Sequence, residues 1–207
     1  MKSEHGGFTV IGITGQTGAG KSTVCDYMKQ CGLAVVNADA VAREVMGAGS
    51  PCLRELAEVF GADILRPDGS LDRKCLARRA FASKEATGQL NRVTHPHILR
   101  RSEEYLRAAG EQGIRAAILD APQLFESGGE VLCDRVIAVT APESVRLSRI
   151  MQRDGITEAE ARLRIGAQHP EAYYTQQADY TIDGSADVRD VQRQTECIIR
   201  GILEQRK

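Results

Sequence analysis

The residues best suited to chemistry lie in one short segment, Thr9 to Met28, with the sequence TVIGITGQTGAGKSTVCDYM. The spacing from Gly15 through Gly20, Lys21 and Ser22 fits the pattern G-x-x-x-x-G-K-[ST]. Glycines let the backbone fold so tightly that successive N–H groups point at phosphate oxygens, and a helix that starts there adds a favourable dipole. In this pattern the lysine reaches the β- and γ-phosphates, and the hydroxyl ligates Mg²⁺. The segment therefore predicts a P-loop that binds a nucleoside triphosphate.

The context of the loop supports this interpretation. Residues 8–14 form a β-rich run that is typical of a buried strand, and residues 21–31 have the i, i+3, i+4, i+7 apolar spacing of an amphipathic helix that ends at Gly32. The alternative is a glycine-rich turn that matches by chance, and the flanking strand and helix disfavour it. The predicted ATP-binding residues of the loop are Gly15, Gln16, Thr17, Gly18, Ala19, Gly20, Lys21, Ser22 and Thr23.

Further strand patterns recur along the chain, with helical segments between them, at residues 34–39, 115–122, 134–142 and 178–183. Strands that alternate with helices predict an α/β fold with a mostly parallel sheet covered on both faces.

Two long segments interrupt this alternation. Residues 41–112 are predicted to be entirely helical and to form a subdomain, with a turn at Pro67-Asp68-Gly69 and Asp72 as the N-cap of the next helix. Residues 152–177 contain Thr157-Glu158-Ala159-Glu160, a capping box that opens another helix. The first segment is suited to an acceptor substrate and the second to a lid.

Transfer of the γ-phosphoryl group is favoured over its hydrolysis. The N-K-x-D signature of a GTPase switch is missing from the sequence, and a motor ATPase would be unusually small at this length and normally needs an arginine from a neighbouring subunit. A helical insertion and an arginine-rich lid are instead the parts of a kinase.

Five arginines lie between Glu143 and Arg164. Arginines on a helix are often only a solvated surface. Next to a P-loop, however, they can neutralise the charge of a moving phosphoryl group, and Arg149 and Arg153 lie one turn apart, so both can face the phosphates. The five residues are Arg146, Arg149, Arg153, Arg162 and Arg164.

Two aspartates end predicted strands, at the sheet edge where ligands bind in open α/β folds. Asp39 can take the proton of an acceptor hydroxyl, and its alternative role is to cap a helix that begins near Val41. Asp120 is suited to holding Mg²⁺ through water, as in a Walker B strand, and its alternative is a turn residue. His95 precedes Pro96, which predicts an extended or turn conformation, and its role is left open between structure and function.

The composition sets the class of protein. With 207 residues, 42% of them hydrophobic and 27% charged, and a net charge of −1, the chain is an ordinary globular protein with none of the basic excess of a nucleic-acid binder. No signal peptide and no run of about 18 apolar residues is seen, which predicts a cytoplasmic protein without a membrane partner. The six cysteines are scattered without metal-ligand spacing, so reduced, mostly buried thiols are expected.

These motifs, taken together, resemble the dephospho-CoA kinase family over nearly the whole chain. The P-loop alone is shared with many activities, whereas the combination of NADAVAREV, RPDGSLDR, HPHI and MQRD is far more specific. Further matches are LDAPQLFESG, DRVIAV, AQ at residues 167–168 and ADYTIDG.

The resemblance implies ATP-dependent phosphorylation of the ribose 3′-hydroxyl of dephospho-CoA, with Mg²⁺ as cofactor. It implies a three-layer P-loop core with a five-stranded parallel sheet (residues 8–40, 113–151 and 178–203), a helical CoA domain (41–112) and a lid (152–177). Asp39 matches the general base and Arg149 a phosphate-contacting arginine, which gives Asp39, Lys21 and Arg149 as catalytic residues. Arg153 joins the ATP site, and Ser22 and Asp120 hold the metal. The residues assigned to the acceptor are Asp39, Arg43, His95 and Leu124.

Three positions depart from the usual family pattern, namely Asn37, Gln123 and Gly184. Asn37 weakens any scheme with two carboxylates, and Gly184 leaves the adenine contacts open. The alternatives to a dephospho-CoA kinase are another small-molecule or nucleotide kinase, or a P-loop regulator that binds ATP without transfer. The sequence leaves the oligomeric state open.

Overall fold

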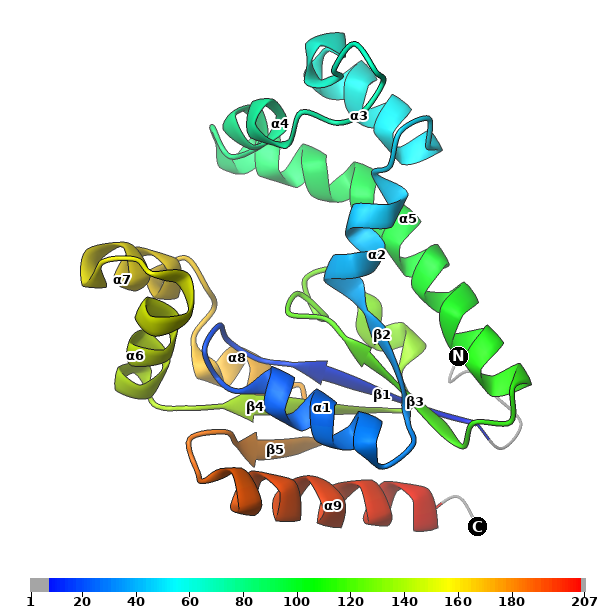
Figure 1. The fold of residues 1–207 in the computed structure, drawn as a ribbon, viewed down its shortest axis with the longest axis vertical. Coiled ribbons are helices and arrows are strands. Elements are labelled where there is room, and N and C mark those ends of the chain that lie inside the picture. The colour runs from blue at the N-terminus through cyan, green and yellow to red at the C-terminus, as the bar shows by residue number, and fades with distance from the viewer. Residues whose placement is uncertain (1–7, 206–207) are drawn as a thin grey trace. The chain divides into compact units, whose positions relative to one another are not determined.

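The structure is a computed structural model that describes residues 8–205. The chain divides into two compact units, one formed by Met1–Val36 with Leu106–Lys207 and the other by Asn37–Tyr105 (Figure 1). The predicted helical insertion, residues 41–112, covers most of the second unit. Each unit has its own apolar core and is described separately.

The first unit is built on a five-stranded sheet with the order β2-β3-β1-β4-β5. The pairs β1–β3, β1–β4 and β4–β5 are parallel, so the predicted α/β fold with a parallel sheet is confirmed. All six residues of β1 are buried, as a central strand covered on both faces requires. The strands are β1 (Thr9–Thr14), β2 (Ala34–Asn37), β3 (Ala116–Asp120), β4 (Arg135–Thr140) and β5 (Tyr180–Asp183).

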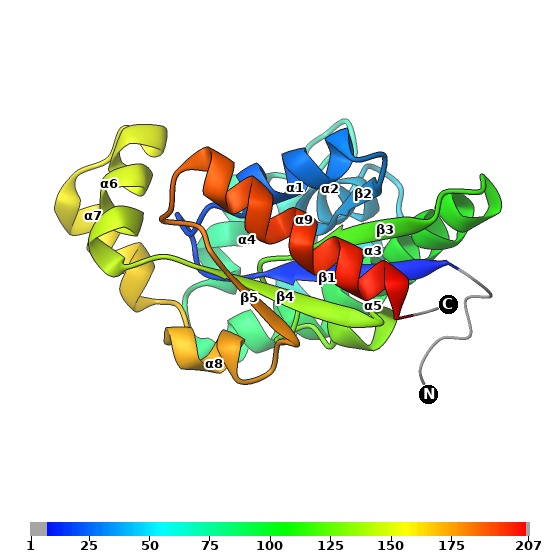
Figure 2. The same ribbon diagram turned by 90° about the horizontal axis from the view of Figure 1, so that it is seen from below.

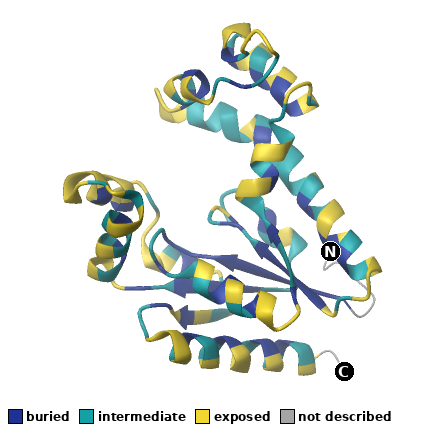
Figure 3. Ribbon diagram, viewed as in Figure 1, coloured by how far each residue is buried: buried dark blue, intermediate teal, exposed yellow. Residues whose placement is uncertain are grey.

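Helices cover both faces of this sheet. Figure 2 shows α1 (Lys21–Gln30) and α9 (Val188–Glu204) on one face and α8 (Glu171–Thr175) on the other. The core between sheet and helices includes Ile13, Met28 and Ile182, all fully buried, and Figure 3 shows the buried strands against the exposed outer side of α9. The remaining elements of the unit are η2 (Gly129–Leu132), α6 (Glu143–Asp154) and α7 (Glu158–Gly166).

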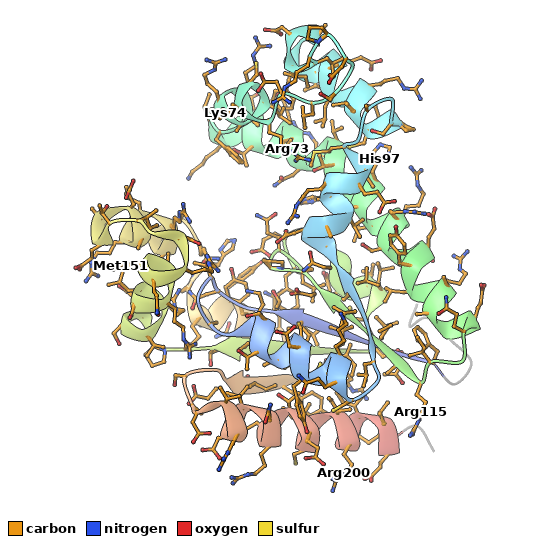
Figure 4. The ribbon with its side chains drawn as sticks, in the orientation of Figure 1. Arg73, Lys74, His97, Arg115, Met151 and Arg200 are labelled. Atoms are coloured by element: carbon orange, nitrogen blue, oxygen red, sulfur yellow. The ribbon has the colours of Figure 1, made fainter. Side chains whose placement is uncertain are left out.

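Helix α7 begins at the predicted capping box. The Thr157 hydroxyl accepts from the Glu160 backbone N–H, and the Glu160 carboxylate accepts from the Thr157 backbone N–H. A small apolar cluster of Ile150, Ala161 and Ile165 joins α6 to α7. Met151, which is labelled in Figure 4, packs against this cluster. The two helices therefore form a packed hairpin.

After Asn37, the last residue of β2, the regular elements of the second unit are helices, as predicted, together with an isolated antiparallel bridge between Leu65 and Leu71. That bridge flanks the predicted turn, in which the Gly69 N–H donates to the Arg66 carbonyl. Asp72 caps α4 as predicted, since its carboxylate accepts from the Lys74 and Cys75 N–H groups. The helices are α2 (Ala38–Val45), α3 (Pro51–Phe60), the short 3₁₀ helix η1 (Ala62–Ile64), α4 (Arg73–Ala80) and α5 (Lys84–Glu111), the last running on into the first unit.

The structure corrects two predicted conformations. Asp39 does not end a strand or cap a helix: β2 stops at Asn37, whose side chain accepts from the Ala40 N–H and caps α2, so Asp39 lies in the first helical turn. His95 is not in a turn but inside helix α5, despite Pro96. Proline in a helix removes one backbone bond, and the packing of Leu90 and Val93 against the core of the second unit stabilises the helix across it.

The expectation of mostly buried cysteines is also only partly correct. Cys25, Cys52 and Cys75 are buried, whereas Cys31 and Cys197 are exposed. All six thiols are free, as predicted.

Helix α3 provides a test of the core of the second unit. Leu56 is fully buried and Val59 is 45% exposed on the same helix. Leu56→Ala is expected to lower the free energy of unfolding by about 2–5 kcal/mol, because it removes apolar contacts and leaves a cavity. Val59→Ala should change it by less than about 0.5 kcal/mol. Urea unfolding followed by circular dichroism measures both, and equal losses would contradict the assigned core.

Candidate active site

The P-loop connects the end of β1 at Thr14 to the start of α1 at Lys21. Its backbone has positive φ at Gly15 (134°), Gly18 (76°) and Gly20 (105°), a region that other residues rarely adopt. A Cβ atom on Gly15 would lie 2.2 Å from the Val139 carbonyl oxygen of β4, and one on Gly18 would lie 2.8 Å from the Arg146 carbonyl oxygen of α6. Glycine is therefore required at both positions by conformation and by space.

The side chain of Lys21 turns back over the start of the loop. Its Nζ donates to the Gly15 carbonyl at 2.7 Å and to the Gln16 carbonyl at 3.4 Å. The Gln16 carbonyl also accepts from the Ala19 N–H at 3.2 Å. These contacts hold the ammonium group at the loop, where a lysine of this motif binds phosphate.

Asp120 and Lys21 both lie near the thiol of Cys25. Burial is the largest cause that raises the pKa of this thiol, the Asp120 carboxylate raises it further, and the Lys21 ammonium lowers it. Asp120 ends β3 directly beside Ile13 of β1, two residues before the loop. The predicted metal residue and the lysine predicted to bind phosphate thus both lie near Cys25, which is a core thiol that stays protonated at neutral pH.

The hydroxyl of Ser22 and the carboxylate of Asp120 are oxygen donors, the type that Mg²⁺ prefers. Ser22 is exposed at the second residue of α1, and Asp120 is half-buried. Among residues 8–205, no group of three or more His, Cys, Asp or Glu side chains has the arrangement of a metal site. The donor set fits a magnesium ion that is also held by nucleotide phosphates.

The structure separates the five arginines of the lid region. Arg149 reaches the P-loop, where its Nη1 donates to the Gly18 carbonyl at 3.2 Å. Arg153 instead pairs with Asp154, which also accepts from Arg164, and Arg162 pairs with Glu143 and Glu158. The Arg153 guanidinium is the main cause that lowers the Asp154 pKa. Of the two arginines predicted to face the phosphates, Arg149 therefore reaches the loop and Arg153 pairs with Asp154 instead, and the phosphate contact of each stays a prediction.

Arg146 lies under the loop. It is 5% exposed, its Nε donates to the Ala141 carbonyl at 3.2 Å, and its backbone packs against Gly18. Its Nη1 is buried without a hydrogen-bond partner in the described part of the chain.

Two contacts to the loop come from the segment between α7 and α8, and no sequence pattern predicts them. The Thr17 N–H donates to Gln168 Oε1 at 2.9 Å, and Gln16 Nε2 donates to the His169 carbonyl at 2.9 Å. Gln168 belongs to one of the motifs that resemble the family. That motif does not identify Thr17 as its partner, because the two residues are 151 positions apart in the sequence.

Gly184, noted as a departure from the family pattern, lies directly against the loop. Its N–H donates to the Thr140 carbonyl at 2.8 Å, and a Cβ atom here would lie 2.0 Å from the Ala19 carbonyl oxygen. The connection from β5 to α9 can approach the P-loop this closely only with glycine at this position.

Three predicted acceptor residues lie in the second unit. Asp39 and Arg43 are on α2 with the spacing of one helical turn, so they share a face of that helix. His95 is half-buried, and burial lowers its pKa, which favours the neutral imidazole. The fourth residue, Leu124, is fully buried in the first unit. It packs against Gly12 of β1 so closely that a Cβ atom on Gly12 would lie 2.8 Å from Leu124 Cδ2. Its contact with an acceptor stays a prediction.

Helix α2 is fastened to α5 by an ion pair and hydrogen bonds. Glu44 accepts from Arg101 and from the Tyr105 hydroxyl, and these groups lower its pKa. His97 of α5, labelled in Figure 4, also interacts within this unit. Its Nε2 lies 3.1 Å from Oε1 of Glu55 on α3. The helix that carries Asp39 is therefore held in place within its own unit.

This fold and loop define the class: a P-loop protein of the nucleotide-dependent kinase type. The solved structure of shikimate kinase from Bacteroides thetaiotaomicron has the same fold, with a TM-score of 0.55 at 14% identity over 95% of this chain and 98% of that chain. In the described residues, no helix is long and apolar enough to span a membrane.

The particular family follows from closer relatives. The model of the family "Dephospho-CoA kinase" matches residues 9–190, and the chain belongs to this family. It is 41% identical to the dephospho-CoA kinase of Corynebacterium glutamicum over 193 residues, which cover 93% of this chain and 96% of the relative. The relative from Corynebacterium diphtheriae is 44% identical over 182 residues, 88% and 90% of the two chains. The structure of dephospho-CoA kinase from Campylobacter jejuni aligns with a TM-score of 0.62 at 25% identity, over 94% of this chain and 97% of that chain.

The contact of Gly184 with the P-loop can be tested by adding a single methyl group. Gly184→Ala should lower kcat/KM for ATP by about 10- to 100-fold, because the new Cβ would displace the Ala19 carbonyl and misplace the loop. Gly201→Ala on α9 is the matched control, since a Cβ there meets nothing within 4 Å. Steady-state kinetics measure both variants, and wild-type kinetics for Gly184→Ala would contradict the close packing described above.

Proposed function

We propose that the protein transfers the γ-phosphoryl group of ATP to the ribose 3′-hydroxyl of dephospho-CoA, giving CoA and ADP, the last step of coenzyme A biosynthesis. The observation that carries the proposal is membership of the dephospho-CoA kinase family together with a complete P-loop, in which Lys21 and Arg149 are bonded to the loop backbone.

The donor side of the reaction rests on the first unit. The backbone N–H groups of the loop and the Lys21 ammonium bind the phosphates, and the Arg149 guanidinium neutralises charge on the transferred group. Because the transition state of phosphoryl transfer is loose, positioning and electrostatics supply most of the rate enhancement. Arg153 would add a second cation after leaving Asp154, which makes it a weaker candidate than Arg149.

Kinases of this type generally use ATP with a divalent metal, and we propose Mg²⁺ held by Ser22 and, through water, by Asp120. Bound there, the ion would neutralise charge on the β- and γ-phosphates. The support is the oxygen chemistry of the two side chains and the position of Asp120 beside the loop.

The acceptor side rests on Asp39. Its carboxylate accepts the proton of the 3′-hydroxyl as that oxygen forms a bond to the γ-phosphorus, while the bond from the γ-phosphorus to the bridging oxygen breaks and ADP leaves. Arg43, His95 and Leu124 are proposed to contact dephospho-CoA. A neutral His95, favoured by its burial, would do so by hydrogen bonding rather than by charge.

The domain roles follow from this assignment. Residues 8–40, 113–151 and 178–203 are the nucleotide-binding core, residues 41–112 the acceptor domain and residues 152–177 the lid. The partners are the two small-molecule substrates, and the cytoplasm is the proposed compartment.

Release of ADP with different acceptors tests the proposed function. Purified protein with Mg²⁺ and ATP is assayed alone and with dephospho-CoA, adenosine or AMP. Strong stimulation by dephospho-CoA alone is expected. Stimulation by another acceptor would assign a different kinase, and ATP binding without stimulation by any acceptor would favour a regulator.

If Asp39 is the general base, its replacement should change kcat and leave the KM for ATP nearly unchanged. Asp39→Asn should lower kcat by about 100- to 10,000-fold, because the amide cannot accept the proton, with the KM for ATP nearly unchanged. Asp68→Asn is the control, an aspartate of the same unit that bonds Ser70 in a turn. Full kcat in Asp39→Asn would remove this residue from the role of base.

A further inference from the structure

The strongest feature without an assigned role is the pair of contacts that joins the P-loop to the segment after α7. Two consecutive loop residues bond two consecutive residues of that segment: the Thr17 N–H donates to Gln168 Oε1, and Gln16 Nε2 donates to the His169 carbonyl, both at 2.9 Å. Gln16 donates from its side chain, and Thr17 donates from its backbone N–H. The contact is therefore a two-point attachment with a defined geometry.

The segment that supplies Gln168 is itself held firmly. The Gln168 N–H donates to the Ile165 carbonyl at the end of α7, and the His169 ring stacks on Tyr173 of α8 at 4.0 Å between centroids. Tyr173 in turn packs edge-on against Phe125, which follows β3, at 6.2 Å. Gln168 is thus fixed from both sides when it meets the loop.

The bond to Thr17 orients one peptide plane. In a trans peptide, the N–H of Thr17 and the carbonyl of Gln16 point in opposite directions. Because the N–H points at Gln168, the Gln16 carbonyl faces the interior of the loop. There it accepts from the Ala19 N–H at 3.2 Å and from Lys21 Nζ at 3.4 Å.

We propose that Gln168 is a positioning residue for the phosphoryl donor: by holding the Thr17 N–H, it sets the peptide plane whose carbonyl bonds Lys21. Gln168 acts through the loop and touches neither the phosphates nor the reacting atoms. The kinetic expectation rests on the proposed function, in which Lys21 binds the phosphates of ATP.

The substitution Gln168→Met removes the acceptor oxygen while keeping an unbranched side chain of similar length. Loss of one neutral hydrogen bond corresponds to roughly a 2- to 10-fold effect. We expect the KM for ATP to rise by that factor, with the KM for dephospho-CoA unchanged. Gln176→Met is the matched control, because Gln176 is an exposed glutamine just after α8.

A second measurement does not depend on activity. Hydrogen exchange of the Thr17 backbone amide, followed by NMR in the protein without nucleotide, should be faster in Gln168→Met than in the wild type by a similar factor. Gln168→Glu keeps an acceptor oxygen and should restore slow exchange at Thr17.

Three results would overturn the proposal. Unchanged Thr17 exchange in Gln168→Met would show that the Gln168 side chain does not protect the Thr17 N–H. Faster exchange with an unchanged KM for ATP would show that the bond forms but does not affect ATP binding. If Gln168→Met lowers kcat, raises the KM for both substrates and lowers the unfolding midpoint, the role of Gln168 is structural only.

If the wild type releases no ADP with dephospho-CoA, the proposed function fails. Thr17 exchange together with calorimetric binding of ATP then still decides the role of Gln168.

Discussion

Close backbone packing around the P-loop is the constraint on which the site depends. Gly15 meets the Val139 carbonyl of β4, Gly18 meets α6 at Arg146, and Gly184 meets Ala19 from the connection between β5 and α9. At each of these points a Cβ atom would lie 2.8 Å or less from a backbone oxygen. Such a loop has little freedom to rearrange, so its N–H groups are organised before a ligand arrives, which is what electrostatic stabilisation of phosphoryl transfer requires.

The cations around the loop fall into two groups with different partners. Lys21 and Arg149 donate to carbonyl oxygens of the loop, whereas Arg153, Arg162 and Arg164 pair with carboxylates. The carboxylate pairs stabilise the α6–α7 hairpin. A bond to a loop carbonyl instead holds Lys21 and Arg149 at the loop, which is the position that their proposed contact with phosphate requires.

Local sequence patterns predicted much of the fold and of the donor site. The P-loop, the capping box at Thr157 and the N-cap at Asp72 are each encoded within a few residues, and all three lie where the sequence indicated. The parallel sheet followed from the alternation of strands and helices.

The errors and omissions have long-range causes. Pro96 predicted a break at His95, but packing of the surrounding helix against the core of the second unit overrides this local preference. The predicted strand before Asp39 is too long because Asn37 ends β2 and its side chain caps α2. Gln168 and Gly184 meet the loop only through tertiary structure, and no periodicity or motif spacing reports a contact between residues so distant in sequence.

The proposed reaction is direct transfer of a phosphoryl group from the P-loop nucleotide to an acceptor hydroxyl. The most direct test is to supply ATP with heavy oxygen in its γ-phosphoryl group together with dephospho-CoA, and to locate the label by mass spectrometry and phosphorus NMR. Direct transfer predicts that the labelled phosphoryl group appears on the ribose 3′-oxygen of the product. Label found only in inorganic phosphate, with dephospho-CoA unchanged, would contradict it.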